Sequence, residues 1–467
     1  ERNTGKFDPI RRILEASPVF SLNTRKEKMQ DTPKSLRLQI GIFGRTNVGK
    51  SSFLNMVAGQ DVAITSPLPG TTTDVVEKAM EFLPVGPVVF LDTGGMDDTS
   101  SLGTDRLRRT RKVFDRSDVT LLVLESGVWT PFEDEVVREA ESRKSPLIVV
   151  INKSDVTPPS AEFLTRVREK TSRFLISVST DLSKRDAQVT ELKRFLLEVC
   201  PDEYLSAPSL LGDLMPRGGL AVLIVPIDAV APKGRIILPQ AQAIRDALDH
   251  HCMALVVKES EYRQALSKLA GLPDLVVCDS QVVEQMVTGT PEKVKCTTFS
   301  ILLSRLKADI VEMTRGALAV DRLKPGDRVL IAESCSHHAI GDDIGRVKIP
   351  AWLKKHLGHD IHIDVTSGRD FPPDVRKYQL VIQCGSCMLT RRETLVRVQR
   401  AKLAGVPITN YGLCISYLRG VLGRVIEPFP EALKAYEDMR KQLPLRHTGA
   451  RSEKDRNGES RGTKERS

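Results

Sequence analysis

Long hydrophobic runs, aromatic side chains and a secretory signal are what this sequence lacks. No apolar run approaches the roughly 18 residues that a membrane-spanning helix needs, so we expect a soluble protein. Aromatic residues make up 5% of the 467 residues, which disfavours surfaces that bind nucleic acids by base stacking. Residues 1–28 contain no apolar segment of the secretory kind. We therefore expect a cytoplasmic protein, or one of an organelle matrix if these residues, which precede a candidate start at Met29, are a targeting remnant.

Positive charge is concentrated at the two ends of the chain. Lys and Arg outnumber Asp and Glu by 69 to 60, a formal net charge of +9. Residues 1–28 and 440–467 contribute +3 and +5, which leaves the remainder nearly neutral. Binding to nucleic-acid phosphates needs clustered Lys and Arg, so nucleic acid is not an expected partner. The charged ends are expected to be solvated and flexible.

Cysteine is also scarce, with eight residues in the chain. Without a secretory signal, this indicates a reducing compartment and free thiols rather than disulfides. Five of these thiols are expected to be buried and structural: Cys200, Cys252, Cys278, Cys296 and Cys414. The remaining three, Cys335, Cys384 and Cys387, occur in short motifs that suggest chemistry.

Short apolar runs alternate with amphipathic polar stretches, which predicts an α/β fold with mainly parallel sheets. We expect a first α/β domain over 35–200 after a flexible extension over 1–34, then a linker over 201–211. Two smaller α/β domains are expected over 212–296 and 297–430, followed by a charged, disordered tail over 431–467. The expected strands are 36–43, 88–92, 119–124, 147–152 and 174–178 in the first domain, 220–226, 254–257 and 275–278 in the second, and 328–333, 361–365 and 379–383 in the third.

Residues 44–51 fit the phosphate-binding pattern G-x-x-x-x-G-K-[ST], between an expected strand and an expected helix. Backbone N–H groups at such a helix start cradle phosphates, Lys50 reaches the β- and γ-phosphates, and the Ser51 hydroxyl ligates Mg²⁺. The predicted nucleotide contacts in this segment are Gly44, Asn47, Val48, Gly49, Lys50, Ser51 and Ser52.

Further motifs complete a guanine-nucleotide site. Residues 92–95 form a D-x-x-G element, in which Asp92 holds the Mg²⁺ shell and the Gly95 N–H meets the γ-phosphate. The N-K-x-D element at 152–155 offers one carboxylate to both N–H donors of guanine, a pair that adenine lacks. The predicted contacts here are Thr71, Thr72, Thr73, Asn152, Lys153, Asp155, Ser177, Val178 and Ser179. Lys50, Asp92 and Gly95 are the predicted catalytic residues.

A second group of motifs indicates a metal site. Cys335-Ser336-His337 and Cys384-Gly385-Ser386-Cys387 each follow an expected strand of the third domain. Parallel neighbouring strands would bring them to one sheet edge, where α/β sheets assemble their sites. Three thiols and one imidazole suit either Zn²⁺ or a 4Fe–4S cluster with one replaceable ligand, and a redox pair at Cys384 and Cys387 is a further alternative.

Four elements follow one another in the sequence: the phosphate-binding loop at 44–51, the threonines at 71–73, the D-x-x-G element and the N-K-x-D element. In this order they resemble the small-GTPase branch that includes tRNA-modification and ribosome-assembly GTPases. That resemblance implies that Asn47 supports a K⁺ ion that stimulates hydrolysis. Met96 stands where Ras-like proteins have a water-positioning Gln, which implies slow intrinsic turnover.

The order of both signatures resembles the HydF family, the GTPases that mature FeFe-hydrogenase, over about residues 36–422. The resemblance includes Leu238-Pro239-Gln240 and Thr409-Asn410-Tyr411-Gly412. It implies a 4Fe–4S cluster on Cys335, Cys384 and Cys387, with His337 as a further candidate ligand. It also implies a homodimer joined through residues 212–296 and a scaffold that holds a two-iron precursor. Two radical-SAM maturases would supply the precursor, and apo FeFe-hydrogenase would receive it. Gln383 departs from the family, which has His there, so the fourth ligand stays open.

Two alternatives belong to other functional classes. One is an RNA-directed GTPase of the tRNA-modification or ribosome-assembly kind with a zinc-stabilised C-terminal domain, which the nearly neutral body of the chain disfavours. The other is a redox-sensing GTPase in which Cys384 and Cys387 form a disulfide. Retention on a heparin-like column without both charged ends would favour the first, and absence of metal after anaerobic purification would favour the second.

Overall fold

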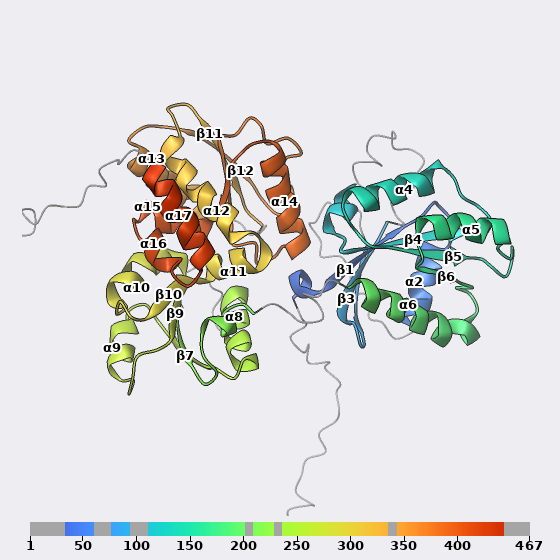
Figure 1. The fold of residues 1–467 in the computed structure, drawn as a ribbon, viewed down its shortest axis with the longest axis horizontal. Coiled ribbons are helices and arrows are strands. Elements are labelled where there is room, and N and C mark those ends of the chain that lie inside the picture. Colours follow the sequence, from blue (N-terminus) through green and yellow to red (C-terminus); the bar gives the residue numbers. More distant parts are fainter. Residues whose placement is uncertain are drawn as a thin grey trace, which may run out of the picture. The chain divides into compact units, whose positions relative to one another are not determined.

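The computed structural model describes residues 33–59, 76–93, 111–200, 209–227, 236–334 and 343–442. These residues form three sheets, of six, four and four strands (Figure 1). No helix among them is long and apolar enough to cross a membrane. The predicted α/β class is therefore confirmed, with a nucleotide-binding type of sheet first and two smaller α/β sheets after it.

The first sheet has the order β2-β3-β1-β4-β5-β6, and only the pair β2 and β3 is antiparallel. Its strands are β1 (Leu38–Phe43), β2 (Val76–Phe82), β3 (Gly86–Asp92), β4 (Val119–Glu125), β5 (Leu147–Asn152) and β6 (Phe174–Ile176). Its helices are α2 (Lys50–Ala58), α4 (Pro131–Ser142), α5 (Ala161–Lys170) and α6 (Arg185–Val199), with short turns η1 (Lys34–Leu36) and η3 (Leu182–Lys184).

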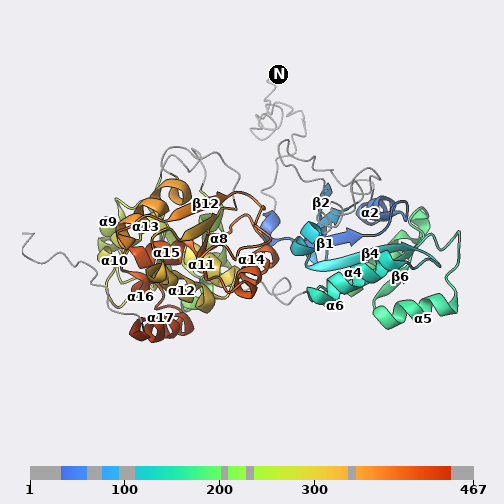
Figure 2. The same cartoon turned by 90° about the horizontal axis from the view of Figure 1, so that it is seen from above.

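Helices cover both faces of this sheet, because its central strands are apolar on both sides. One core holds side chains of α2 and α6, such as Phe53 and Leu192, against Ile40 and Ile42 of β1. The other holds side chains of α4 and α5 against the opposite face (Figure 2). This doubly covered sheet fixes the loops at the carboxyl ends of the strands, where the nucleotide motifs lie.

The second sheet is parallel, with the order β10-β9-β7-β8. Its strands are β7 (Leu220–Ile224), β8 (Met253–Val257), β9 (Leu275–Cys278) and β10 (Lys295–Thr298). Its helices are α8 (Leu238–Asp249), α9 (Tyr262–Ser267), α10 (Val283–Gly289) and α11 (Phe299–Lys307), with turns η4 (Gly212–Leu214) and η5 (Ser280–Val282).

The third sheet is also parallel, with the order β12-β11-β13-β14. Its strands are β11 (Arg328–Ala332), β12 (His362–Thr366), β13 (Leu380–Gln383) and β14 (Ile408–Asn410). Its helices are α12 (Ile310–Leu318), α13 (Ile349–Leu357), α14 (Arg391–Leu403), α15 (Tyr411–Leu418), α16 (Leu422–Val425) and α17 (Pro430–Gln442), with turns η6 (Ala319–Arg322) and η7 (Ile344–Lys348), the latter a π-helical turn.

One continuous core of buried residues runs through the second and third sheets and their helices. Helix α11 contributes Leu302 and Leu303 to this core. It also receives hydrogen bonds from the third sheet, since the Asn410 side-chain amide donates to the Ser300 carbonyl at 2.7 Å. The two smaller sheets are thus packed together rather than joined by a loose linker.

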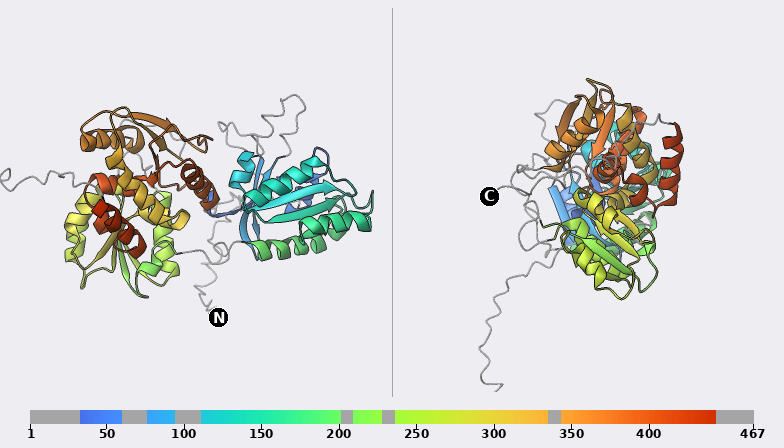
Figure 3. Two further views of the ribbon diagram at one scale, coloured as in Figure 1. Left: turned by 45° about the horizontal axis from the view of Figure 1, so that its top comes forward. Right: turned by 90° about the vertical axis from the view of Figure 1, so that its left-hand side faces the viewer.

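Three expectations about the fold need correction. Residues 430–442, most of which were expected in the disordered tail, form helix α17, whose Ala432 and Ala435 are buried (Figure 3). Leu210 and Leu211, expected in the linker, are buried in the core that the second and third sheets share. Strands β2, β10 and β14 were not among the expected strands. Strand β2 is a charged edge strand with only its last residue buried, and the other two have four and three residues.

Candidate functional site

The phosphate-binding loop lies between β1 and α2, as expected. Gly49, the residue before α2, has φ 92° and Asn47 has φ 63°, so both adopt the left-handed conformation. A Cβ on Gly49 would lie 2.3 Å from the side-chain nitrogen of Asn152, which explains why glycine is needed there. The loop therefore turns with its backbone close to the neighbouring guanine motif.

Lys50 is 5% exposed, and its Nζ donates to the carbonyls of Gly44 at 2.7 Å and Arg45 at 2.9 Å. The ammonium thus lies over the loop that the sequence assigns to the phosphates. The next residue faces the D-x-x-G element, because the Ser51 hydroxyl donates to Asp92 Oδ2 at 3.2 Å. A hydroxyl and a carboxylate at this separation are suitable oxygen ligands for one Mg²⁺.

The guanine motif is tied to the phosphate-binding loop through one side chain. The Asn152 amide donates to the Val48 carbonyl at 2.9 Å and accepts from the Ser179 backbone N–H at 3.2 Å. Asn152 and Val48 are both 1% exposed. The 44–51 and 177–179 segments are consequently held together by a buried amide, before any nucleotide is considered.

The remaining predicted nucleotide contacts occupy different environments. Ser177 is buried and its hydroxyl bonds Gln188 at 2.6 Å, while Val178 is also buried. Lys153 adopts φ 59° and Asp155 and Ser52 are exposed. Thr71, Thr72, Thr73 and Gly95 lie outside the described residues. The structure thus brings together the contacts from the 44–51, 92, 152 and 177–179 positions.

One anchor of this loop was not predicted from the sequence. Arg45 Nε lies 2.9 Å from Glu133 Oε1, and the Glu133 side chain is fully buried. Glu133 also caps α4, because its Oε2 accepts the Thr130 backbone N–H at 2.8 Å. The Thr-x-x-Glu capping pattern was visible in the sequence, but its link to the loop was not.

The second candidate site lies at the carboxyl ends of β11 and β13. These strands are parallel neighbours, as expected, with Ala332 opposite Gln383. The Ser334 backbone N–H and hydroxyl lie 3.1 Å and 2.9 Å from Cys384 Sγ. Because Ser334 immediately precedes Cys335, the chain enters the C-x-H motif beside the first thiol of the C-x-x-C motif.

Cys335 and His337 themselves lie outside the described residues. Cys384 and Cys387 are of intermediate exposure and are not joined in a disulfide. Within the described ranges, no group of three or more His, Cys, Asp or Glu side chains is placed to hold a metal ion. Burial raises the pKa of the Cys384 thiol, and hydrogen bonds from Ser334 and Ser386 oppose this shift. Two thiols at a strand end, one already accepting N–H and O–H donors, fit the ligand chemistry of an iron–sulfur cluster or zinc.

Gln383, which departs from the HydF pattern, is 1% exposed. Its side-chain nitrogen lies 2.5 Å from the Ser386 hydroxyl, and its Oε1 has no hydrogen-bond partner within the described ranges. The amide thus bridges the base of the C-x-x-C loop. Ser386 adopts φ 55°, a left-handed turn that directs the chain from Cys384 to Cys387.

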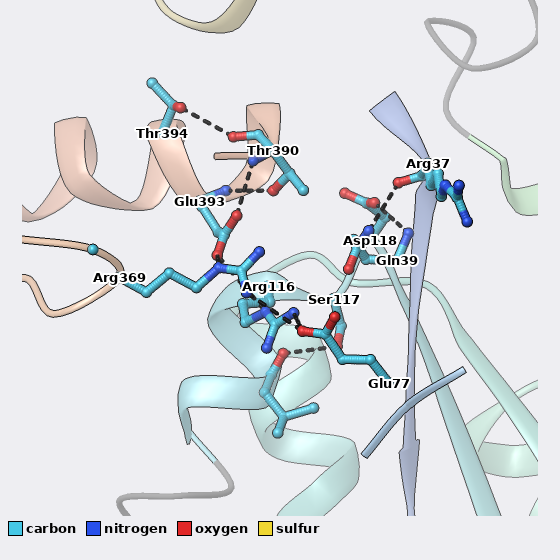
Figure 4. Close-up of polar contacts among 12 residues, drawn as sticks. Arg37, Gln39, Glu77, Arg116, Ser117, Asp118, Arg369, Thr390, Glu393 and Thr394 are labelled. Atoms are coloured by element: carbon cyan, nitrogen blue, oxygen red, sulfur yellow. Dashed lines mark hydrogen bonds and ion pairs between the residues drawn. The ribbon is translucent and has the colours of Figure 1, made fainter. Parts of the chain in front are cut away.

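Helix α14 begins directly after this loop with a capping box. The Thr390 backbone N–H donates to Glu393 Oε2 at 2.8 Å, and the Glu393 N–H donates to the Thr390 hydroxyl at 3.1 Å. Glu393 Oε1 pairs with Arg369 Nε at 2.9 Å (Figure 4). The Glu393 carboxylate is therefore already engaged by a helix end and a guanidinium.

Two buried cations near these thiols were not found from the sequence. Lys307 ends α11 and Arg397 lies on α14, and they are 2% and 3% exposed. Burial lowers the pKa of Lys307 to about 8, against the opposing charges of Cys387, Glu393 and Cys384. Neither residue stands in a recognisable motif, so no signal in the sequence distinguished them from surface charges.

The five thiols expected to be structural behave as predicted. All five are buried: Cys200, Cys252, Cys278, Cys296 and Cys414. Burial raises the pKa of Cys414 to about 12 and that of Cys296 to about 11.

Three family models match this chain in order. A 50S ribosome-binding GTPase model matches residues 39–153, the hydrogen maturase F dimerization domain matches 210–308, and the hydrogen maturase F tetramerization domain matches 311–428. The last match contains the C-x-x-C loop, and Lys307 falls in the preceding one.

Individual relatives match the GTPase part. The tRNA modification GTPase MnmE of Synechococcus sp. (strain JA-2-3B'a(2-13)) is 42% identical over 126 residues, 26% of each chain. GTPase Der of Persephonella marina is 30% identical over 171 residues, 36% of this chain and 38% of Der. The chain thus spans only about a quarter to two fifths of these relatives.

A solved structure of Era from Aquifex aeolicus is 20% identical, covering 47% of this chain and 93% of Era, with a TM-score of 0.28. The family models match segments of all three sheets, in the order that the sequence motifs predicted. By its GTPase domain and its two hydrogen maturase F domains, the chain belongs to the hydrogen maturase F family.

Proposed function

We propose that this chain is a GTP-hydrolysing scaffold that holds a 4Fe–4S cluster and carries a two-iron precursor to apo FeFe-hydrogenase. The observation that carries the proposal is the hydrogen bonding of Ser334 to Cys384 Sγ, in a chain of the hydrogen maturase F family. This contact directs the chain into the C-x-H motif beside the C-x-x-C thiols. The cluster ligands would be Cys335, Cys384 and Cys387, with His337 as a candidate for the open position.

The cluster supplies an iron with a replaceable ligand, at which a second iron unit can dock. The protein's own groups would hold it: Cys384 and Cys387 in the loop after β13, and Cys335, the residue that follows Ser334 in the sequence. Hydrogen bonds from Ser334 to Cys384 Sγ stabilise the thiolate form that ligates iron. We assign the transfer partners as two radical-SAM maturases, which supply the precursor, and the apo-hydrogenase, which receives it.

GTP hydrolysis is proposed as the switch for partner exchange. Lys50, now bonded to the Gly44 and Arg45 carbonyls, would turn to the β- and γ-phosphates when GTP binds. Ser51 and Asp92 would hold Mg²⁺, and Asn47 would hold K⁺. Water then displaces GDP from the γ-phosphoryl group, giving GDP and phosphate. Ordering of loops by the γ-phosphate would distinguish the GTP-bound from the GDP-bound chain.

The family matches also support an oligomer. The segment over 210–308 matches a dimerization domain and that over 311–428 a tetramerization domain. We therefore propose a homodimer that associates further into a tetramer, built from residues 210–428.

A transfer assay tests the proposal. The chain is incubated anaerobically with the two maturases and their substrates, repurified, and added to apo FeFe-hydrogenase, and hydrogen evolution is measured. The wild type and the control Cys414→Ser, which alters a buried thiol outside the motifs, should activate the hydrogenase. Cys384→Ala should not. Equal activation by Cys384→Ala and the wild type would contradict the scaffold role.

A further inference from the structure

Lys307 is buried beneath the loop that carries the C-x-x-C thiols. It is the last residue of α11 and is 2% exposed. Its Nζ donates to the carbonyls of Ser386 at 2.8 Å and Leu389 at 2.7 Å, and approaches that of Cys387 at 3.4 Å. Three carbonyls of one four-residue loop thus converge on one ammonium, which fixes the loop between the second cysteine and α14.

This ammonium has no ionic partner. Among the described residues no carboxylate forms an ion pair with Lys307, and its hydrogen bonds all go to neutral carbonyls. A buried charge without a counter-charge is strongly disfavoured. The groups that favour the charged form of Lys307 include the thiols of Cys387 and Cys384. Thiolates that stay negatively charged, as in a bound cluster, would therefore stabilise the charged form of Lys307.

A second buried cation lies near the same thiols. Arg397 is 3% exposed, and its Nη2 donates to the Gly368 carbonyl at 2.9 Å. Its Nη1 is buried and has no hydrogen-bond partner among the residues that the structure describes. Cys384 favours the charged form of Arg397 as well. The guanidinium is therefore a second buried positive charge on which Cys384 acts.

The carboxylate that acts on both cations is Glu393. Its oxygens already accept the Thr390 N–H and pair with Arg369. Glu393 thus acts on Lys307 and Arg397 while it is already paired with the exposed Arg369. Two buried cations, Lys307 and Arg397, therefore share one engaged carboxylate, while a cluster with three thiolate ligands is anionic.

We propose that Lys307 and Arg397 are buried positive charges that compensate the negative charge of a cluster bound at Cys384 and Cys387. They thereby raise the reduction potential of the cluster. Lys307 also holds the loop in place by donating hydrogen bonds to the carbonyls of Ser386 and Leu389. Both are positioning residues, because they act through the thiolates and not on a substrate. Reduction adds a negative charge to the cluster, so removing a buried positive charge disfavours the reduced state. This inference rests on the proposed iron–sulfur function.

Redox titration of the reconstituted full chain, monitored by EPR, tests the inference. Lys307→Gln removes the charge but keeps hydrogen-bond donors for the loop, and Lys307→Arg keeps the charge. Arg397→Gln removes the second charge without altering a bond to the loop. Lys348→Gln is the matched control, because the Lys348 amine bonds Gln281 at 2.7 Å and makes no bond to the loop.

We expect Lys307→Gln and Arg397→Gln each to shift the oxidised-to-reduced ratio at fixed potential about tenfold, a midpoint lower by ~59 mV for a one-electron couple. Lys307→Arg and Lys348→Gln should stay near the wild type. A wild type with four irons and unchanged midpoints in both glutamine variants would overturn the inference alone. A wild type without iron would overturn the proposed function and the inference together. If Lys307→Gln folds but binds no iron, the midpoint of Arg397→Gln decides between support and rejection.

Discussion

The backbone N–H of Ser334 lies 3.1 Å from the Sγ of Cys384, so the residue before one cysteine motif donates to the first thiol of the other. The contact arises because β11 and β13 are adjacent parallel strands and the Cys384 N–H bonds the Ala332 carbonyl at 3.0 Å. Ser334 and Cys384 lie 50 residues apart in the sequence. The parallel pairing of β11 and β13 thus brings the residue before Cys335 next to Cys384, which the spacing of the motifs alone could only suggest.

Ser334→Ala tests this contact. The substitution removes the hydroxyl donor at 2.9 Å from Cys384 Sγ and leaves the backbone donor in place. We expect full iron content but a lower reduction potential, since hydrogen bonds to ligating sulfurs favour the more negative reduced state. The change should be smaller than that of Lys307→Gln, because a neutral donor is lost and not a charge. Redox titration measures it, and a potential above that of the wild type would contradict the assignment.

The nucleotide and cluster sites should be separable by mutation. Lys50→Ala removes the amine that the phosphates need and should lower GTP hydrolysis at least about 100-fold, while iron content is retained. Cys384→Ala should lose the cluster and keep the GTPase rate. Phosphate release and anaerobic iron analysis on both variants check this. If either substitution removes both properties, the sites are not independent modules.

GTP hydrolysis should depend on K⁺ through the side chain of Asn47. We expect the GTPase rate to be higher in KCl than in NaCl, and Asn47→Gly to abolish the difference. Glycine accepts the φ of 63° that Asn47 adopts, so this variant removes the side chain without straining the loop. Asn47→Ala adds a backbone cost of about 1–2 kcal/mol and serves to separate strain from ion binding. Equal wild-type rates in the two salts would contradict the K⁺ assignment.

Asn152 should stabilise the GTPase domain even without nucleotide. Asn152→Ala leaves the buried Val48 carbonyl and the Ser179 N–H without their partner. A loss of about 2–4 kcal/mol in the free energy of unfolding follows, with weaker GDP binding. Calorimetry of the full chain measures it. The control Asn55→Ala, whose side chain bonds Lys78 on the surface, should change stability by less than about 0.5 kcal/mol, and an equal effect of both would contradict the proposed tie.

Much of the fold and of the nucleotide site could be predicted from the sequence. Strands such as 147–152 are continuous apolar runs between helical patterns, and the phosphate-binding loop is specified by local residues. The contribution of Lys307 could not be predicted, because α11 ends 77 residues before Cys384 and only tertiary packing brings its amine under the loop. Helix α17 was missed for a similar reason: its sequence is highly charged, and only Ala432 and Ala435 are buried, while Leu433, Tyr436 and Met439 pack partly buried against the core.

Thiol reactivity separates the motif cysteines from the structural ones. Burial raises the pKa of Cys414 to about 12, so its thiolate becomes populated only as the pH rises toward that value. Iodoacetamide should therefore label Cys387 in the folded apo-protein and leave Cys414 unmodified until the chain is denatured. Mass spectrometry of the labelled peptides checks this, and equal labelling of both would show that Cys414 is not buried in solution.

Anaerobic iron, sulfide and zinc analysis with EPR tests the central claim most directly. It compares the reconstituted full chain with a triple variant carrying Cys335→Ala, Cys384→Ala and Cys387→Ala. We predict about four irons and four sulfides per wild-type chain, as a 4Fe–4S cluster requires, and a reduced-cluster signal that the triple variant lacks. One zinc and no iron in the wild type would contradict the iron–sulfur scaffold and favour a GTPase with a zinc-stabilised C-terminal domain.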